Sequence, residues 1–235
     1  MSATLLYEGK AKKVFATENP NQVRVEFKDD ATAFNGQKRG QIIGKGVINA
    51  TVSAHLFRLL GQHDIETHFV DDPVPGELLV DRLRIVPLEV VVRNRVAGSL
   101  QKRTGLEEGT PLSFAVVEMY YKSDVLGDPL LNEDHIRILH LASPDLTARL
   151  KSEALRINDV LTPYLAPRGL ILVDFKLEFG MTDQGVLKLG DEISPDTCRL
   201  WDTATGKKLD KDRFRQDLGT VEEAYQEVRD RILAR

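Results

Sequence analysis

Cysteine is nearly absent from this chain of 235 residues, which contains a single one, Cys198. One cysteine excludes a disulfide framework and is typical of proteins from a reducing compartment. Long apolar runs are also missing. No stretch approaches membrane-spanning length, and the N-terminus, MSATLLYEGKAKK, has no apolar signal core. We therefore expect a cytoplasmic protein that does not interact with a membrane.

An excess of positive charge is absent as well. The formal net charge is −4 and the pI is about 5.8, so the broad basic field of a nucleic-acid-binding protein is not expected. Any anionic ligand must then be held by local clusters of Arg and Lys. Hydrophobic residues make up 42% of the chain and charged residues 29%, as is ordinary for a globular protein with a real core.

Several motifs of catalysis do not occur. The nucleophile-elbow pattern GxSxG is missing, and the five histidines show neither HExxH nor another metal-ligand spacing. Cys198 has no obvious histidine partner, so thiolate catalysis is not expected. The segment Gly40–Gly46 is one residue short of P-loop spacing and has glycine where Ser or Thr should hold magnesium. It is better interpreted as the entry to a helix.

The order of the predicted elements indicates the fold class. Short strands come first, with one amphipathic helix (45–60) that Gly61 ends, and longer helices follow in a block. This order predicts an α+β fold with a smaller N-terminal lobe (1–85) and a larger C-terminal lobe (86–235). Strands are predicted at 5–7, 14–16, 23–27, 66–70, 78–85 and 88–96, the last two as buried neighbours. Helices are predicted after the caps Asn132, Ser143 and Thr220, the last of them reaching Arg235.

The most informative stretch is 169–202, which opens with GLILVDFKLEFG. Asp174, Lys176 and Glu178 alternate with apolar residues, so the three charged groups share one strand face. A turn and a second strand (186–189) then deliver Asp191 and further carboxylates. Carboxylate oxygens suit magnesium and the phosphates that travel with it, although alternating charges can also mark a solvated sheet face. The apolar pattern favours a register with Lys188 near Glu178 and Asp191 at the strand exit.

Two further segments carry cations. The turn Gly9-Lys10-Ala11-Lys12 lies between two predicted strands, where glycine allows close approach of a phosphate; a solvated basic hairpin is an equal alternative. In VVRNRVAGS a buried strand runs into a turn with Arg93, a glycine and the Ser99 hydroxyl, which suits a phosphate monoester. The competing interpretation is a pair of structural arginines. Further candidates for the same anions are Arg199, Lys211 and Arg215.

Taken together, these residues predict a magnesium and nucleotide-phosphate site beside a separate phosphate site. That combination favours ATP-dependent phosphoryl or acyl chemistry on a phosphorylated small molecule. The residues alone leave kinase and ligase open.

A family resemblance extends this interpretation. The segments LYEGKAK, VVRNRVAGSL, ILVDFKLEFG, LGDEISPD, RLWD and DKDRFRQDLG occur in the order seen in phosphoribosylaminoimidazole-succinocarboxamide synthases (SAICAR synthetases) of purine biosynthesis. They extend from residue 6 to about 219, so the chain resembles this family over nearly its whole length. The resemblance implies an α+β fold whose N-terminal lobe is similar to kinase and ATP-grasp nucleotide domains.

The resemblance also implies a reaction: ATP, carboxyaminoimidazole ribotide (CAIR) and L-aspartate give SAICAR, ADP and phosphate. ATP would phosphorylate the CAIR carboxylate, and the aspartate amine would attack the acyl phosphate. The alternatives are a small-molecule kinase and a non-catalytic nucleotide-binding module. Family members are often oligomeric, which suggests a homodimer.

Site residues follow from the resemblance by role. ATP would be bound by Gly9, Lys10, Ala11, Lys12, Val14, Lys122 and an adenine hinge around Arg82 and Leu83, and Mg²⁺ by Glu178 and Asp191. The CAIR phosphate would be held by Arg93, Ser99 and Arg199. The catalytic residues would be Lys176, Asp174, Asp128 and Asp196, and Lys211 and Arg215 would bind the remaining substrate groups. The segment Ala33–Ala50 departs from the family pattern at Gly40 and Ala50, so no aspartate-binding residues are predicted.

Overall fold

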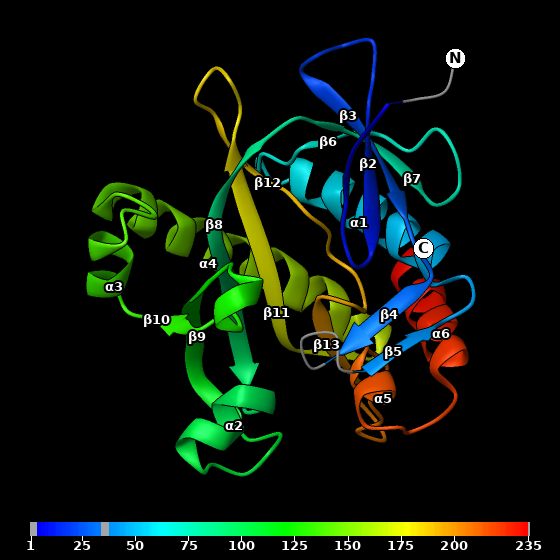
Figure 1. The fold of residues 1–235 in the computed structure, drawn as a ribbon. Coiled ribbons are helices and arrows are strands. Elements are labelled where there is room, and N and C mark those ends of the chain that lie inside the picture. The colour runs from blue at the N-terminus through cyan, green and yellow to red at the C-terminus, as the bar shows by residue number, and fades with distance from the viewer. Residues whose placement is uncertain (1–3, 34–37, 235) are drawn as a thin grey trace.

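The structure, a computed structural model, describes residues 4–33 and 38–234 (Figure 1). Residues 34–37, within the segment that departs from the family pattern, lie outside the described residues, as does Arg235, the predicted end of the last helix. Among the helices that are described, none is both long and apolar enough to cross a membrane.

A five-stranded antiparallel sheet occupies the first third of the chain (Figure 1). Its strands, in spatial order, are β1 (Leu5–Glu8), β2 (Lys12–Ala16), β3 (Gln22–Phe27), β7 (Glu77–Asp81) and β6 (Phe69–Asp71). Apolar residues of β3 are buried at every second position, which is the period of a strand with one covered face. That face is covered by α1 (Lys45–Gly61). A separate ribbon pairs β4 (Asp30–Ala33) with β5 (Lys38–Gln41).

A six-stranded antiparallel sheet forms the rest of the framework. It runs β10 (Leu130–Leu131), β9 (Pro111–Tyr121), β8 (Arg84–Arg95), β11 (Leu170–Met181) and β12 (Leu187–Leu189), and β13 (Cys198–Asp202) also pairs with β11. The long helix α4 (Pro144–Leu165) packs behind β8 and β11 (Figure 1). The remaining helices are α2 (Gly98–Thr104), α3 (Glu133–Ile138), α5 (Asp212–Arg215), α6 (Val221–Leu233) and the 3₁₀ turns η1 (Asp124–Leu126) and η2 (Ala166–Arg168). The predicted α+β class is confirmed, with antiparallel sheets.

Helices begin directly after all three predicted caps, and the cap side chain accepts a backbone hydrogen bond in two of them. Asn132 forms a capping box with His135, and the Ser143 hydroxyl accepts a hydrogen bond from the backbone N–H of Leu146. Thr220 is the N-cap residue of α6, as predicted, but its side chain makes no cap hydrogen bond. Its backbone is left-handed and its hydroxyl instead accepts a hydrogen bond from Arg213 Nη2, at 2.6 Å. The glycine-rich segment before α1 does mark a helix entry, because Gly44 is the N-cap residue.

The predicted pair of neighbouring strands at 78–85 and 88–96 was wrong. Arg82 and Leu83 belong to no strand, so β7 and β8 are separate strands. β7 belongs to one sheet and β8 to the other. Pro87 lies inside β8, at an irregularity where the register against β11 shifts between Ile85 and Glu89. A bulge tolerates proline because no ladder N–H is required there. The long strand β9 was not predicted at all.

The two sheets meet where Arg82 and Leu83 connect them. A Cβ atom added at Gly180 would lie 2.7 Å from the Cβ of Leu83, so the connection packs directly on the backbone of β11. Thr67 forms an isolated parallel bridge with Leu189, and this bridge brings the five-stranded sheet against β12. One continuous hydrophobic core extends through both sheets. The division into lobes at residue 85 stays a prediction.

Candidate active site

One large cavity, of about 680 Å³, opens between the two sheets. The face of β11 that carries Asp174, Lys176 and Glu178 forms its floor, as the period-two pattern predicted. All the predicted site residues line it except Val14, which packs against the core, and Arg82 and Leu83, at the connection between the sheets. The cavity has two clusters of charge, about 13 Å apart along β11 at 3.3 Å per residue.

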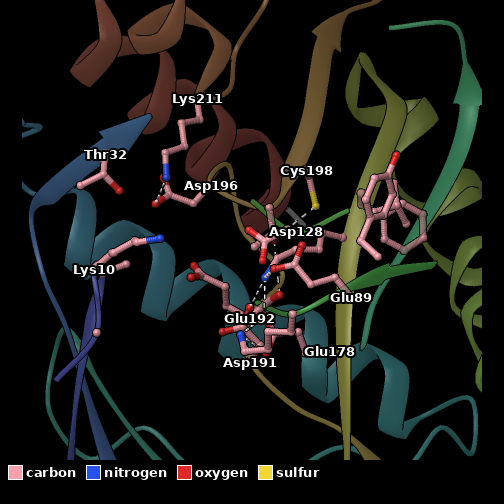
Figure 2. Close-up of a pocket in the computed structure, with 18 of the residues that line it drawn as sticks. Lys10, Thr32, Glu89, Asp128, Glu178, Asp191, Glu192, Asp196, Cys198 and Lys211 are labelled. Carbon is pink, nitrogen blue, oxygen red and sulfur yellow. Dashed lines mark hydrogen bonds and ion pairs between the residues drawn. The ribbon is translucent and has the colours of Figure 1, made fainter. Parts of the chain in front are cut away.

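The first cluster, the lysine end, consists of Lys12, Lys122 and Lys176 with Glu178 and Asp191. Lys122 Nζ donates to both carboxylate oxygens of Glu178 at 2.8 Å. Lys176 Nζ donates to Glu178 at 2.5 Å and to Asp191 at 3.1 Å, so one ammonium group lies between two carboxylates. Lys12 pairs with Asp191 from the opposite side. Figure 2 shows Glu178 and Asp191 together on one wall of the cavity.

These pairs keep the lysine end ionised. Burial lowers the pKa of Lys12, but the attraction of Asp191 and then Glu192 outweighs it, so the pKa rises above its ordinary value. The pKa of Lys176 is raised in the same way by Asp191 and Glu178. Burial also raises the pKa of Asp191, and the charges of Lys12 and Lys176 more than reverse this, leaving it well below its usual range. Both signs of charge therefore persist at neutral pH.

The position of Asp191 comes from the end of β12. Gly190 N–H donates to the Glu178 carbonyl at 2.8 Å, and Asp191 then adopts a left-handed backbone with φ of 56°. This confirms Asp191 at the strand exit. The predicted register was wrong, because Lys188 lies opposite Gly180 rather than Glu178 and pairs with Asp81 at 2.8 Å. The left-handed turn brings Asp191 back over the cavity, which strand periodicity does not predict.

The turn between β1 and β2 covers the lysine end. Gly9 N–H donates to the Lys12 carbonyl at 2.8 Å, and a Cβ atom at Gly9 would lie 3.1 Å from the Tyr7 ring. Lys10 reaches across the cavity to Asp124 of η1 at 2.6 Å, in an exposed ion pair. Asp128, a predicted catalytic residue, accepts a hydrogen bond from the Ser123 N–H at 2.8 Å and so closes the turn beside it.

The second cluster, the arginine end, consists of Arg93, Arg199 and Arg215 with Asp174 and Asp212. Arg93 is only 3% exposed, and its guanidinium donates to Asp174 at 2.6 Å. Its other donors go to Glu118 at 2.7 Å, Ser99 at 2.9 Å and Tyr120 at 3.1 Å. The structure thus favours a structural role for much of the Arg93 fork, with Ser99 exposed above it.

Arg199 comes from β13, whose pairing with β11 places it opposite Asp174. Its Nη1 donates to both oxygens of Asp174, at 3.0 and 2.8 Å, and its Nε donates to Asp212 at 2.7 Å. The guanidinium lies flat against Gly98, where a Cβ atom would be 2.5 Å from Nη2. Gly98 also has a φ of +54°, so both its backbone and its lack of a side chain are required here.

A third group of residues borders the cavity near α1, α5 and α6. The carboxylate of Asp196 accepts hydrogen bonds from Lys45 at 3.0 Å, from Lys211 at 3.4 Å and from the Tyr225 hydroxyl at 2.7 Å. Lys211 and Asp196 lie together in Figure 2, across the cavity from Glu178. Burial raises the pKa of Asp196, and Lys211 and Lys45 then lower it below its ordinary range. Asp196 is therefore a poor proton acceptor.

Several residues of the site were not predicted. They are Tyr7, Asp30, Thr32, Lys45, Glu89, Glu118, Tyr120, Asp124, Glu192, Thr197 and Asp212. For Lys45 a signal was present, because it lies three and seven residues before Ile48 and Val52 on the buried face of α1, where a lysine must have a partner. The residues of β9 had no such signal in the sequence, because that strand was not predicted.

Magnesium has oxygen donors available at the lysine end. Glu178 and Asp191 face the same cavity, and Mg²⁺ in nucleotide sites takes one or two carboxylates together with substrate phosphates. Residues 4–33 and 38–234 contain no group of three or more His, Cys, Asp or Glu side chains that could hold a metal. The broader carboxylate cluster predicted from the sequence was wrong, because Asp174 and Asp196 are each engaged elsewhere by Arg or Lys. The donor set fits an ion that completes its coordination on a ligand.

Fold and cavity are those of an α+β protein whose cleft carries lysines at one end and arginines at the other. The family model of SAICAR synthetase matches residues 5–232, and the chain belongs to this family. The phosphoribosylaminoimidazole-succinocarboxamide synthase of Brevibacillus brevis is 57% identical over 227 residues, which are 97% of this chain and 95% of that protein.

Solved structures agree with this assignment. A SAICAR synthetase in complex with ADP is 50% identical, with a TM-score of 0.94 and 97% of each chain covered. The synthase of Ehrlichia chaffeensis is 45% identical, with a TM-score of 0.95, covering 98% of this chain and 99% of that one.

Proposed function

We propose that this chain is an ATP-dependent ligase that joins L-aspartate to the carboxylate of CAIR, giving SAICAR, ADP and phosphate in purine biosynthesis. One observation carries the proposal: a chain that matches the SAICAR synthetase family over residues 5–232 keeps its predicted charged residues around a single cavity. The relative solved with ADP supports ATP as the nucleotide.

The lysine end is the proposed nucleotide site. Gly9, Lys10 and Lys12 would lie along the phosphates, and Leu83 and its neighbour Arg82 would contact the base from the connection between the sheets. Glu178 and Asp191 would hold Mg²⁺, which neutralises phosphate charge when bound. In the structure, Lys122 and Lys176 donate hydrogen bonds to these carboxylates. When ATP binds, the two lysines would turn toward its phosphates. Such cations stabilise the charge that spreads over the transferred phosphoryl group.

The arginine end is the proposed site for the CAIR phosphate. Arg199 and Arg215 supply guanidinium donors at the cavity wall, and the exposed Ser99 hydroxyl adds a further one. With its phosphate there, CAIR would have its carboxylate toward the middle of β11, near Lys176 and the ATP phosphates. Holding both substrates along one strand face would supply much of the rate by positioning. Asp128, Asp174, Asp196 and Lys211 would line the remaining surface.

The proposed chemistry has two steps. The CAIR carboxylate oxygen attacks the terminal phosphorus of ATP, and the bond from that phosphorus to the ADP oxygen breaks. The aspartate amine then attacks the acyl carbon, phosphate leaves with its bonding electron pair, and the amine loses a proton to solvent. An amide and inorganic phosphate remain.

The test is release of ADP by the purified protein with Mg-ATP and CAIR, with and without L-aspartate. We expect ADP and SAICAR to accumulate in equal amounts only when aspartate is present. ADP formed from CAIR without aspartate would instead indicate a kinase or an uncoupled acyl phosphate. Nucleotide binding without turnover under any combination would overturn the proposal and leave a nucleotide-binding module.

We also propose a cytoplasmic homodimer with lobes at 1–85 and 86–235. The sheet boundary at Arg82 and Leu83 supports the lobes, and the single buried cysteine supports a reducing compartment. The oligomeric proposal rests on the family resemblance and is tested by light scattering of the purified protein.

A further inference from the structure

Behind the arginine end lie two buried carboxylates, one on the guanidinium groups of the cavity and one on the backbone next to them. They are Asp210 and Asp212, which precede and begin α5. Neither is among the residues that line the cavity. Asp212 pairs with the two arginines that face the ligand space, and Asp210 accepts hydrogen bonds from backbone N–H groups beside them.

Asp212 binds both arginines at once. Its Oδ2 accepts a hydrogen bond from Arg199 Nε at 2.7 Å, and its Oδ1 accepts one from Arg215 Nη1 at 2.6 Å. Asp212 is 3% exposed, so these charge-assisted bonds are shielded from water. Burial raises the pKa of Asp212, but Arg199 and Arg215 outweigh this and lower it, so the carboxylate stays ionised.

Asp210 holds the backbone on which this arrangement depends. Its Oδ2 accepts from the N–H of Leu200, which follows Arg199, at 2.9 Å, and its Oδ1 accepts from the N–H of Asp212 at 2.7 Å. One carboxylate therefore joins β13 to the start of α5. Asp212, two residues further on, orients the side chains of Arg199 and Arg215, which those two elements carry.

The remaining donors of the two arginines determine what this arrangement can do. Arg199 uses Nε and Nη1 on Asp212 and Asp174, and Arg215 uses Nη1 on Asp212. Within residues 4–33 and 38–234, neither Nη2 has a hydrogen-bond partner. A guanidinium fixed on one side presents its free side in a set direction, which costs little ordering when an anion binds.

We propose that Asp212 is a positioning residue for the phosphate of the CAIR substrate, acting through Arg199 and Arg215. Asp210 supports it by fixing the two backbone segments. This inference rests on the proposed function, because it names the substrate group that the oriented arginines receive. It assigns Asp212 no contact with substrate.

The experiment compares Asp212→Asn with the wild-type protein in a steady-state assay for ADP and SAICAR. We expect the KM for CAIR to rise about 10- to 100-fold, by analogy with the loss seen when the outer partner of a metal ligand is removed. The KM for ATP and kcat should stay within about twofold, because the lysine end is untouched. Asp212→Glu should recover part of the CAIR affinity, since it restores the charge.

Asp202→Asn is the matched control. Asp202 lies on β13 and does not line the cavity. It accepts a hydrogen bond from Thr205 and forms an ion pair with Arg231 at 2.8 Å. It should lower the melting temperature without changing the KM for CAIR. A fall in stability that left the KM for CAIR unchanged in Asp212→Asn as well would overturn the inference.

A double-mutant cycle with Arg199→Ala separates positioning from a general structural effect. If Asp212 acts through Arg199, Asp212→Asn should raise the KM for CAIR by less than about threefold in the Arg199→Ala background. The effect that remains there would be the part that Asp212 exerts through Arg215. An undiminished effect there would contradict the inference. Wild-type protein without aspartate-dependent turnover would refute the proposed function, whereas turnover with a normal KM in Asp212→Asn would refute this inference alone.

Discussion

The two ends of the cavity hold their positive charges in different ways. At the lysine end, three ammonium groups share the carboxylates Glu178 and Asp191 directly, so the groups proposed to bind the ligand are each other's partners. At the arginine end, Arg199 and Arg215 are held from behind by Asp212. The lysine end must exchange partners when phosphates arrive, while the arginine end is already arranged.

This difference follows from the side chains themselves. An ammonium group is a compact charge on a flexible stem, and it can turn from a carboxylate to a phosphate. A guanidinium is a planar fork that binds on two sides at once. We therefore expect nucleotide binding to depend on Mg²⁺ and on exchange of ion pairs, and CAIR binding to depend on preformed geometry.

The largest expected effect comes from breaking the lysine end. Asp191→Asn removes the carboxylate that Lys12 and Lys176 share and one proposed ligand of Mg²⁺. We expect kcat for ADP release to fall about 100- to 1,000-fold and the Mg²⁺ concentration for half-maximal rate to rise. Asp81→Asn is the control, because Asp81 pairs with Lys188 outside the cavity. Equal losses in both variants would contradict the assignment.

The next effect tests the arginine end. Arg199→Lys keeps the charge but cannot bind Asp174 and Asp212 together. We expect the KM for CAIR to rise about 10- to 100-fold, with the KM for ATP unchanged. Arg231→Lys, on α6 and outside the cavity, should leave both constants unchanged. A rise in the KM for ATP equal to that for CAIR would show that the two ends are not separate sites.

A pH effect is expected behind the arginine end. Burial, and then the charge of Asp212, raise the pKa of Asp210 to about 7, from an ordinary value of about 3.9. The folded state thus holds this proton more tightly than the unfolded state does. The contribution of this proton to the free energy of unfolding is complete below about pH 4 and is lost as pH rises through about 7.

Asp210→Asn removes this proton equilibrium. Between pH 5 and pH 8, the wild-type protein should lose on the order of 2 kcal/mol more of its free energy of unfolding than the variant. Urea denaturation at the two pH values measures the difference. Parallel losses in both proteins would show that Asp210 is ionised throughout. Asp191 and Asp196 do not contribute in this range, because their lowered pKa values leave them ionised.

The smallest effect is expected at the mouth of the lysine end. The ion pair between Lys10 and Asp124 is exposed at both residues, so solvent and salt screen it. Asp124→Asn should change the free energy of unfolding by no more than about 0.5 kcal/mol. It should slightly strengthen ATP binding by releasing Lys10, as isothermal titration can measure. Weaker ATP binding would show that the pair helps to close the turn over the ligand.

Periodicity in the sequence predicted the floor of the cavity but not its walls. The alternation of Asp174, Lys176 and Glu178 with apolar residues is a local property, so it placed three groups on one face correctly. The position of Lys188 depends on how two strands align, which local pattern does not determine. Asp191 depends on one left-handed residue after the strand.

Long-range partners were the hardest to predict. Pro87 suggests a break in a strand, and only the bulge against β11 explains why β8 continues through it. Lys45 looked like part of a failed phosphate loop, and its partner Asp196 is 151 residues further along the chain. Asp212 was hidden in a charged segment typical of a solvated helix. Its role depends on β13 bringing Arg199 beside it.

The hydrogen bond from Tyr225 to Asp196 has a consequence for synthesis of the protein. Tyr225 lies on α6 and is fully buried against Asp196, whose other two partners, Lys45 and Lys211, are made earlier. Asp196 therefore lacks one of its three partners until α6 has left the ribosome. In a nascent chain stalled before residue 221, the border of the cavity near α1 and α5 should therefore still be incomplete.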